Sequence, residues 1–140
     1  MNVSTRRFLG VIAIAVLVGG CAGGGDEGGG GAPQPTLTWL QQNIFTPICA
    51  DCHVGANAPH GLLLEAGKMR DNTVNVKSHE APAFTRIIPG DPDNSYVMIK
   101  IVPTDARRID SRMPANGPPF LSDAQIEAVR QWIKNGAKDD

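Results

Sequence analysis

The sequence predicts an all-α fold of three to five helices. Two segments, 36–49 and 122–136, carry apolar residues at spacings of three and four, which is the repeat of one helix face. No convincing run of alternating strand residues lies between them. A chain of 140 residues has room for one domain with a modest core. We therefore expect a single helical domain over residues 36–140.

The first helix is predicted to begin after Thr36, whose hydroxyl is suited to accept a hydrogen bond from the first turn. Its apolar stripe ends next to Cys49, so this helix would deliver that cysteine to the domain interior. The stripe consists of Leu37, Leu40, Ile44 and Ile48.

The last helix has the clearest signals. Ser122 is its expected N-cap, and Gln125 stands where the partner in a capping box belongs. The helix should end at Asn135-Gly136. Its apolar face would comprise Ile126, Val129, Trp132 and Ile133.

The middle of the chain has weaker signals. We expect short helices over Leu62–Met69 and Ser95–Val102, the second introduced by a turn over Gly90–Ser95. The segment Met113–Phe120 contains three prolines and a glycine, so it is predicted to be an extended loop.

Residues 1–20 differ from the rest of the chain. Arg6 and Arg7 precede an apolar run, Phe8–Val18, that is too short to span a bilayer, a pattern typical of a secretory signal. The run that ends at Cys21 resembles the lipobox of bacterial lipoproteins, which implies lipidation of that cysteine. The alternative is an ordinary cleaved signal with an incidental cysteine near the cut.

Residues 21–35 are rich in glycine and contain no large apolar side chain. Such a segment cannot form a core, and we interpret it as a flexible tether between an anchor at Cys21 and the domain. The formal net charge of the whole chain is −1, with no basic stripe, so no nucleic-acid partner is expected.

The chemistry is predicted by Cys49-Ala50-Asp51-Cys52-His53, which fits the C-x-x-C-H signature of covalent haem attachment. Two cysteines three positions apart can reach the two vinyl groups of one porphyrin, and the next residue then meets the iron. Cys49 and Cys52 would form the thioethers of one haem c, and His53 would be the proximal ligand.

Other readings of this motif have less support. A thioredoxin-like dithiol would need a βαβ context, and structural zinc would need a second pair of ligands. Chance occurrence of the five-residue pattern in a chain this long is on the order of one in a thousand. We therefore expect haem.

The sixth iron ligand has several candidates. Met98 lies in a predicted helix among apolar residues, where methionine usually fills the core, and Met69 has the same explanation. His60 and His79 are more typical of solvated loop histidines. Met113 opens the proline-rich loop, where a thioether can be held out toward a flat cofactor, and is the preferred candidate.

These residues resemble the class I cytochrome c family over nearly all of Leu37–Lys138. The resemblance implies a helix that leads into the haem motif, a methionine ligand from an extended loop, and a C-terminal helix that crosses the first through contacts such as Phe45 with Trp132. It also implies a proline carbonyl that accepts from the haem histidine. Pro59 is the nearest candidate, but it follows His53 sooner than in the family pattern.

The resulting hypothesis is a periplasmic, membrane-tethered carrier of single electrons with His/Met ligation. Its partners would be redox proteins that dock transiently and the membrane that holds the lipid; no small-molecule substrate and no enzyme activity are expected. The alternatives are an electron-entry subunit of a larger oxidoreductase, and a haem enzyme or ligand sensor with an open distal site.

Overall fold

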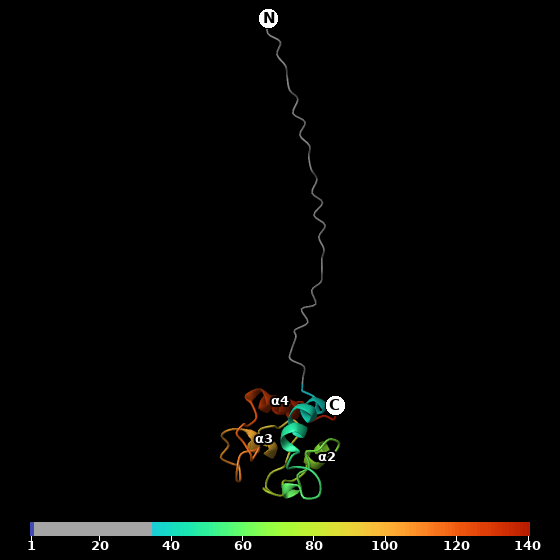
Figure 1. Ribbon diagram of the computed structural model, residues 1–140, viewed down its shortest axis with the longest axis vertical. Helices are drawn as coiled ribbons and strands as arrows, with labels where there is room; N and C mark the ends of the chain where they lie inside the picture. The colour runs from blue at the N-terminus through green and yellow to red at the C-terminus, as the bar shows by residue number, and fades with distance from the viewer. Residues whose placement is uncertain (2–34) are drawn as a thin grey trace.

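The structure is a computed structural model that describes Met1 and residues 35–140 (Figure 1). This part of the chain is helical and contains isolated β-bridges but no strand, so the predicted all-α class is confirmed. The predicted signal segment, Cys21 and the tether fall on residues 2–34, outside the described residues. Over the remainder, no helix combines the length and the apolar character needed to cross a membrane.

The first helix begins as predicted. Helix α1 spans Leu37–Leu40, and the Thr36 hydroxyl accepts from the Trp39 N–H at 3.0 Å. The chain then continues as a π-helix, η1, over Gln41–Cys49. Pro47 lies inside it and has no N–H for the helical ladder, which is a physical reason for the change in winding.

Asp140 links the end of the described chain to its first helix. Its carboxylate accepts from the Leu37 N–H at 2.8 Å, and its main-chain oxygen accepts from the Thr38 N–H at 2.9 Å. These acceptors satisfy two N–H groups of the first turn of α1. The label C beside the start of α1 in Figure 1 marks this junction.

The last helix, α4, spans Asp123–Lys134 and carries both bonds of the predicted capping box between Ser122 and Gln125. Asn135 is its C-cap, as expected. The helix packs against α1 and against α3 (Figure 1). Trp132 is buried and donates its indole N–H to the Lys138 carbonyl at 2.9 Å.

The predicted helix over Leu62–Met69 is wrong. Leu62 has extended backbone, Gly67 has a φ of 76°, and the helix in this region is α2, over Met69–Thr73. Tertiary hydrogen bonds decide the conformation, since Leu64 N–H donates to the His53 carbonyl at 2.8 Å. An apolar run as short as Leu62–Leu64 does not distinguish helix from extended chain by its periodicity.

The other expectations for the middle of the chain are confirmed. Helix α3 spans Tyr96–Ile101, with Ser95 and Val102 as its caps. The Ser95 hydroxyl donates to the Asp91 carbonyl at 2.7 Å and accepts from Ile88 N–H at 2.8 Å, which fastens the preceding turn. Residues 113–120 contain no helix, and a short 3-10 helix, η2, occupies Pro59–Gly61.

The main core lies between α1, η1, α3 and α4. Phe45 and Trp132 both belong to it, as do Met69 and Met98, which are 1% and 2% exposed. Met98 therefore has the core-filling role expected of it, and Met69 has the same one. The largest members of this core include Leu40, Ile44, Phe45, Met69, Ile87, Met98, Trp132 and Ile133.

Candidate functional site

One cavity of about 270 Å³ brings together the cysteine–histidine motif and the proline-rich loop. The wall is mainly apolar on the side of η1 and α3, and it also receives side chains from the segments at 59–64 and 113–116. The residues central to its chemistry are Cys49, Cys52, His53 and Met113; their apolar neighbours include Ile44, Phe45, Ile48, Leu62, Leu64, Val97, Ile101, Leu121 and Val129.

The two cysteines have different surroundings, although both line this cavity as free thiols. Cys49 ends η1 and packs against the main core. Burial raises the pKa of the Cys49 thiol to about 12, so the thiol is protonated at neutral pH. Cys52 lies one turn further along and is exposed.

Two hydrogen bonds orient His53, one from its backbone N–H and one from its ring. Its N–H donates to the Cys49 carbonyl at 3.0 Å, and its Nδ1 lies 3.2 Å from the Leu62 carbonyl oxygen. That contact places the ring proton on Nδ1 and leaves the Nε2 lone pair for a metal. Burial lowers the pKa of His53, because the charged imidazolium is poorly solvated there, and the neutral ring is the ligating form.

The Leu62 carbonyl is therefore the acceptor for the histidine ring, and Pro59 is not. Pro59 lines the cavity, but the chain turns through η2 before its backbone reaches the ring. The sequence offered no signal for Leu62 in this role, because any residue can supply a carbonyl.

Met113 is held at the cavity by helix α3. Its N–H donates to the Lys100 carbonyl at 2.9 Å, and the adjacent Arg112 donates from Nε to the Ile101 carbonyl at 2.8 Å. The side chain is partly buried and packs against the main core. Of the candidate methionines, Met113 lines the cavity, whereas Met69 and Met98 do not.

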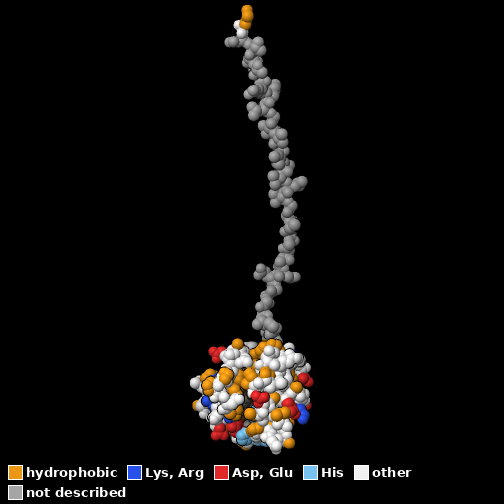
Figure 2. All heavy atoms as spheres, in the orientation of Figure 1, with side chains coloured by type: hydrophobic (Ala, Val, Ile, Leu, Met, Phe, Trp, Pro, Cys, Tyr) orange, Lys and Arg blue, Asp and Glu red, His pale blue; other side chains and the backbone are white. Residues whose placement is uncertain are grey.

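The two candidate histidines are both exposed, His60 in η2 and His79 in a loop. His60 lines the cavity and His79 does not. Figure 2 shows histidine side chains together at the lower edge of the domain, below a surface on which hydrophobic side chains are frequent. Neither histidine is placed in the core.

Part of the cavity wall is polar, and sequence reasoning missed it. Lys100 is only 6% exposed and donates to Glu80 at 2.8 Å and to the Ile109 carbonyl at 2.7 Å. The Tyr96 hydroxyl is buried beside the Glu80 side chain and the Ile109 backbone, and burial raises the pKa of Tyr96. Arg86 completes this side of the wall. The available signal was a charged residue among apolar ones, Arg86 within residues 84–88 and Lys100 within residues 96–101.

The donor set fits a haem. The cavity offers two thiols for covalent attachment, a neutral histidine with Nε2 available, a thioether and a mostly apolar wall. Across the described residues, no three His, Cys, Asp or Glu side chains form a group able to hold a metal ion by themselves, so zinc has no such support.

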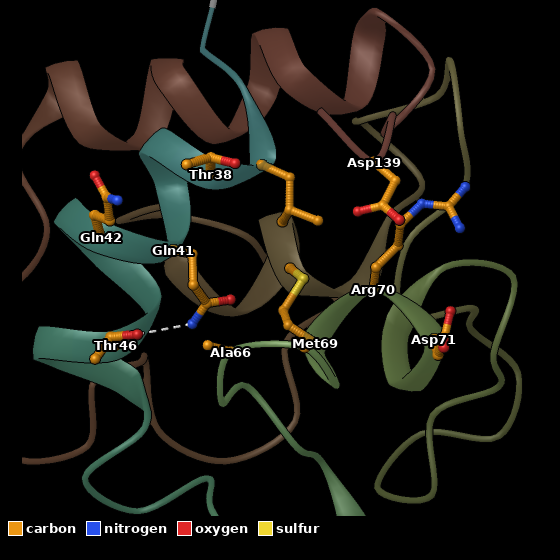
Figure 3. Close-up of a pocket in the computed structure, with 11 residues that line it drawn as sticks. Thr38, Gln41, Gln42, Thr46, Ala66, Met69, Arg70, Asp71 and Asp139 are labelled. Carbon is orange, nitrogen blue, oxygen red and sulfur yellow. Dashed lines mark hydrogen bonds between the residues drawn. The ribbon is translucent and has the colours of Figure 1, made fainter.

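A second depression, of about 610 Å³, lies between α1, η1 and α2 (Figure 3). Gln41 spans part of it, donating to Thr46 at 2.9 Å and to the Leu64 carbonyl at 2.9 Å. Its other labelled residues include Arg70, Asp71 and Asp139. The described residues that line it include no cysteine or histidine.

Comparison with known proteins adds no assignment. No family model matches the chain, and the searches of curated proteins and of solved structures find no match either.

The contrast between the two thiols predicts different reactivity before haem attachment. A rise in pKa from 9.0 to about 12 reduces the thiolate fraction of Cys49 at neutral pH about a thousandfold. In a Cys21→Ser chain produced without haem, the Cys52→Ser variant, which retains Cys49, should react with iodoacetamide at least about a hundredfold more slowly in buffer than in denaturant.

The matched variant is Cys49→Ser, which retains the exposed Cys52 and should show a much smaller difference between the two conditions. Mass spectrometry of timed samples gives both rates. Equal protection of the two thiols would contradict the burial of Cys49.

Proposed function

We propose that this protein is an exported single-electron carrier that holds one covalent haem c. The observation that carries the proposal is the convergence of Cys49, Cys52, His53 and Met113 on one mostly apolar cavity. The first three are adjacent in the sequence, whereas Met113 is distant and reaches the cavity only through its attachment to α3. Residues 36–140 would form the cytochrome c-type domain.

Each residue has a distinct task. Cys49 and Cys52 would hold the haem by thioether bonds, and His53 and Met113 would be its axial ligands. When bound, the haem supplies an iron that changes between ferrous and ferric states. The chain contributes a ring fixed by the Leu62 carbonyl, a methionine whose main-chain N–H is held by the Lys100 carbonyl, and apolar walls that exclude water.

The arrangement supports a carrier more than a haem enzyme with an open distal site. Met113 lines the cavity and packs on the core, so a thioether is available to close the sixth position. A closed site has no room for peroxide or a small ligand. We therefore propose that the partners are redox proteins that dock transiently and that the chain acts on no small-molecule substrate.

We further propose that lipidated Cys21 and the glycine-rich segment 21–35 tether the domain to the periplasmic face of a bacterial membrane. The support is the sequence of residues 1–35, which has a short apolar run ahead of a lone cysteine. Glycine-rich chain is flexible, so the domain would be free to turn toward its partners.

The proposed function is tested by purifying the protein from cells that attach haem to exported cytochromes. The wild type should give a haem-stained band in a denaturing gel and a low-spin spectrum with a thioether-to-iron band. The Cys49→Ala, Cys52→Ala double variant should lose the stain completely, while Cys21→Ser keeps it. An unstained wild-type protein would refute the proposal.

Met113→Ala should keep the covalent haem but abolish the thioether band, lower the reduction potential and allow imidazole to bind, because the sixth position opens. Optical titration and potentiometry measure these changes. Met98→Leu is the control, since Met98 lies in the core away from the cavity and its replacement should leave the band intact. The opposite pattern would show that Met98 is the ligand.

Cys21→Ser should release the protein from the membrane fraction without changing its spectrum. Each buried CH₂ of an acyl chain contributes about 0.8 kcal/mol to membrane binding, whereas the chain is slightly acidic and is not attracted to anionic lipids. Fractionation at high salt measures the distribution of the two proteins. Continued pelleting of the variant would mean that the apolar run or a membrane partner holds the chain.

A further inference from the structure

Residues 60–63 form the loop that presents the Leu62 carbonyl to His53, and two side chains from outside the loop hold it. The Arg86 guanidinium donates from Nη2 to the His60 carbonyl at 2.8 Å and from Nη1 to the Gly61 carbonyl at 3.4 Å. Asn72 accepts through Oδ1 from the Leu63 N–H at 2.7 Å. The loop is therefore fixed on both sides of Leu62.

These two side chains also bind each other. Arg86 Nη1 lies 2.8 Å from Asn72 Oδ1 and 2.7 Å from the Asn72 carbonyl. Asn72 is part of α2, while the Arg86 N–H donates to Val76 and the Arg86 carbonyl accepts from Val97 of α3. The pair therefore links the loop to two helices.

The environment of Arg86 is unusual for a charged residue. It is 5% exposed, and within residues 35–140 it forms no ion pair. Burial of an unpaired charge is costly unless hydrogen bonds compensate for the lost water. Here the compensating acceptors are oxygens of residues 60, 61 and 72. The planar guanidinium of Arg86 reaches several of them at once, whereas the ammonium group of a lysine does not.

We propose that Arg86 and Asn72 are positioning residues for the haem histidine: they clamp residues 60–63 so that the Leu62 carbonyl holds the His53 ring by its Nδ1–H. This inference rests on the proposed function. A carbonyl bonded to Nδ1–H makes the imidazole a stronger electron donor and favours ferric iron. A loosened clamp weakens that bond, and the reduction potential rises.

The test uses haem-loaded protein with the substitutions Arg86→Lys and Asn72→Ala. Neither changes the formal charge, so a purely electrostatic role of Arg86 predicts no change in potential. The clamp predicts a higher potential in both variants, and His53 Nδ1–H exchange with solvent that is about tenfold faster or more in the ferrous protein, as followed by NMR.

Arg108→Gln is the matched control. Arg108 also donates to a carbonyl, that of Val102 at 2.9 Å, but that segment does not contact His53. Its replacement should leave ring-proton exchange unchanged, and the loss of a positive charge should not raise the potential. Unchanged exchange and potential in both clamp variants, with the wild type carrying haem, would overturn the clamp alone.

Two results remain decisive if the variants do not fold. In the wild type, the Leu63 amide and the His53 ring proton should be protected to within about tenfold of each other, because one opening of the loop exposes both. A protection factor for the ring proton more than about a hundredfold smaller than that of the Leu63 amide, each taken relative to the exchange rate of the same group in an unstructured peptide, would overturn the clamp. A wild type without covalent haem would overturn the proposed function, and this inference with it.

Discussion

The site is organised by the pairing between His53 and the segment Leu62–Leu64. The His53 ring meets the Leu62 carbonyl oxygen through Nδ1 at 3.2 Å, and the His53 carbonyl accepts from the Leu64 N–H at 2.8 Å. Two contacts thus close the loop between these residues and leave one ring nitrogen for a metal. Without them the histidine would rotate freely, and its ring would have no preferred tautomer.

Because of this pairing, residues 62–64 do not form a helix. The segment at 62–64 would otherwise be a candidate for helix, but most of its backbone groups bond to residues outside its own turn. Leu62 and Leu64 bond to His53, and Leu63 bonds to Asn72. Helix α2 consequently begins only at Met69, after the positive φ of Gly67. A local preference worth a few tenths of a kcal/mol per residue is overridden by buried hydrogen bonds worth about 1 kcal/mol each.

The cavity combines an apolar side with a buried polar side, and the two have different consequences. The apolar side continues into the core beneath η1 and α3, so a flat apolar ligand would extend that core. On the other side, Lys100 donates to Glu80 and to the Ile109 carbonyl, and the Tyr96 hydroxyl is buried beside the same two groups. Polar groups buried together in this way compensate one another for the loss of water.

The loop that carries Met113 depends on α3 for its position. Main-chain oxygens at the end of that helix accept from Met113 N–H and from Arg112 Nε. Because the last carbonyls of a helix have no partner within it, they are available to bind a neighbouring loop. A short helix of the middle region therefore serves both the core, through Met98, and the candidate site, through Met113.

Local sequence was sufficient for features that depend on neighbouring residues. The caps at Thr36 and Ser122, the bounds of the last helix and the cysteine–histidine spacing all involve groups a few positions apart, so propensity and periodicity reveal them. The place of Met113 in a proline-rich loop already made it the preferred methionine, and the structure places it at the cavity. Tertiary structure alone decided which carbonyl meets the His53 ring and where Arg86 places its charge. These contacts join residues distant in the chain, and a backbone carbonyl has no identity in the sequence, so no local pattern could specify them.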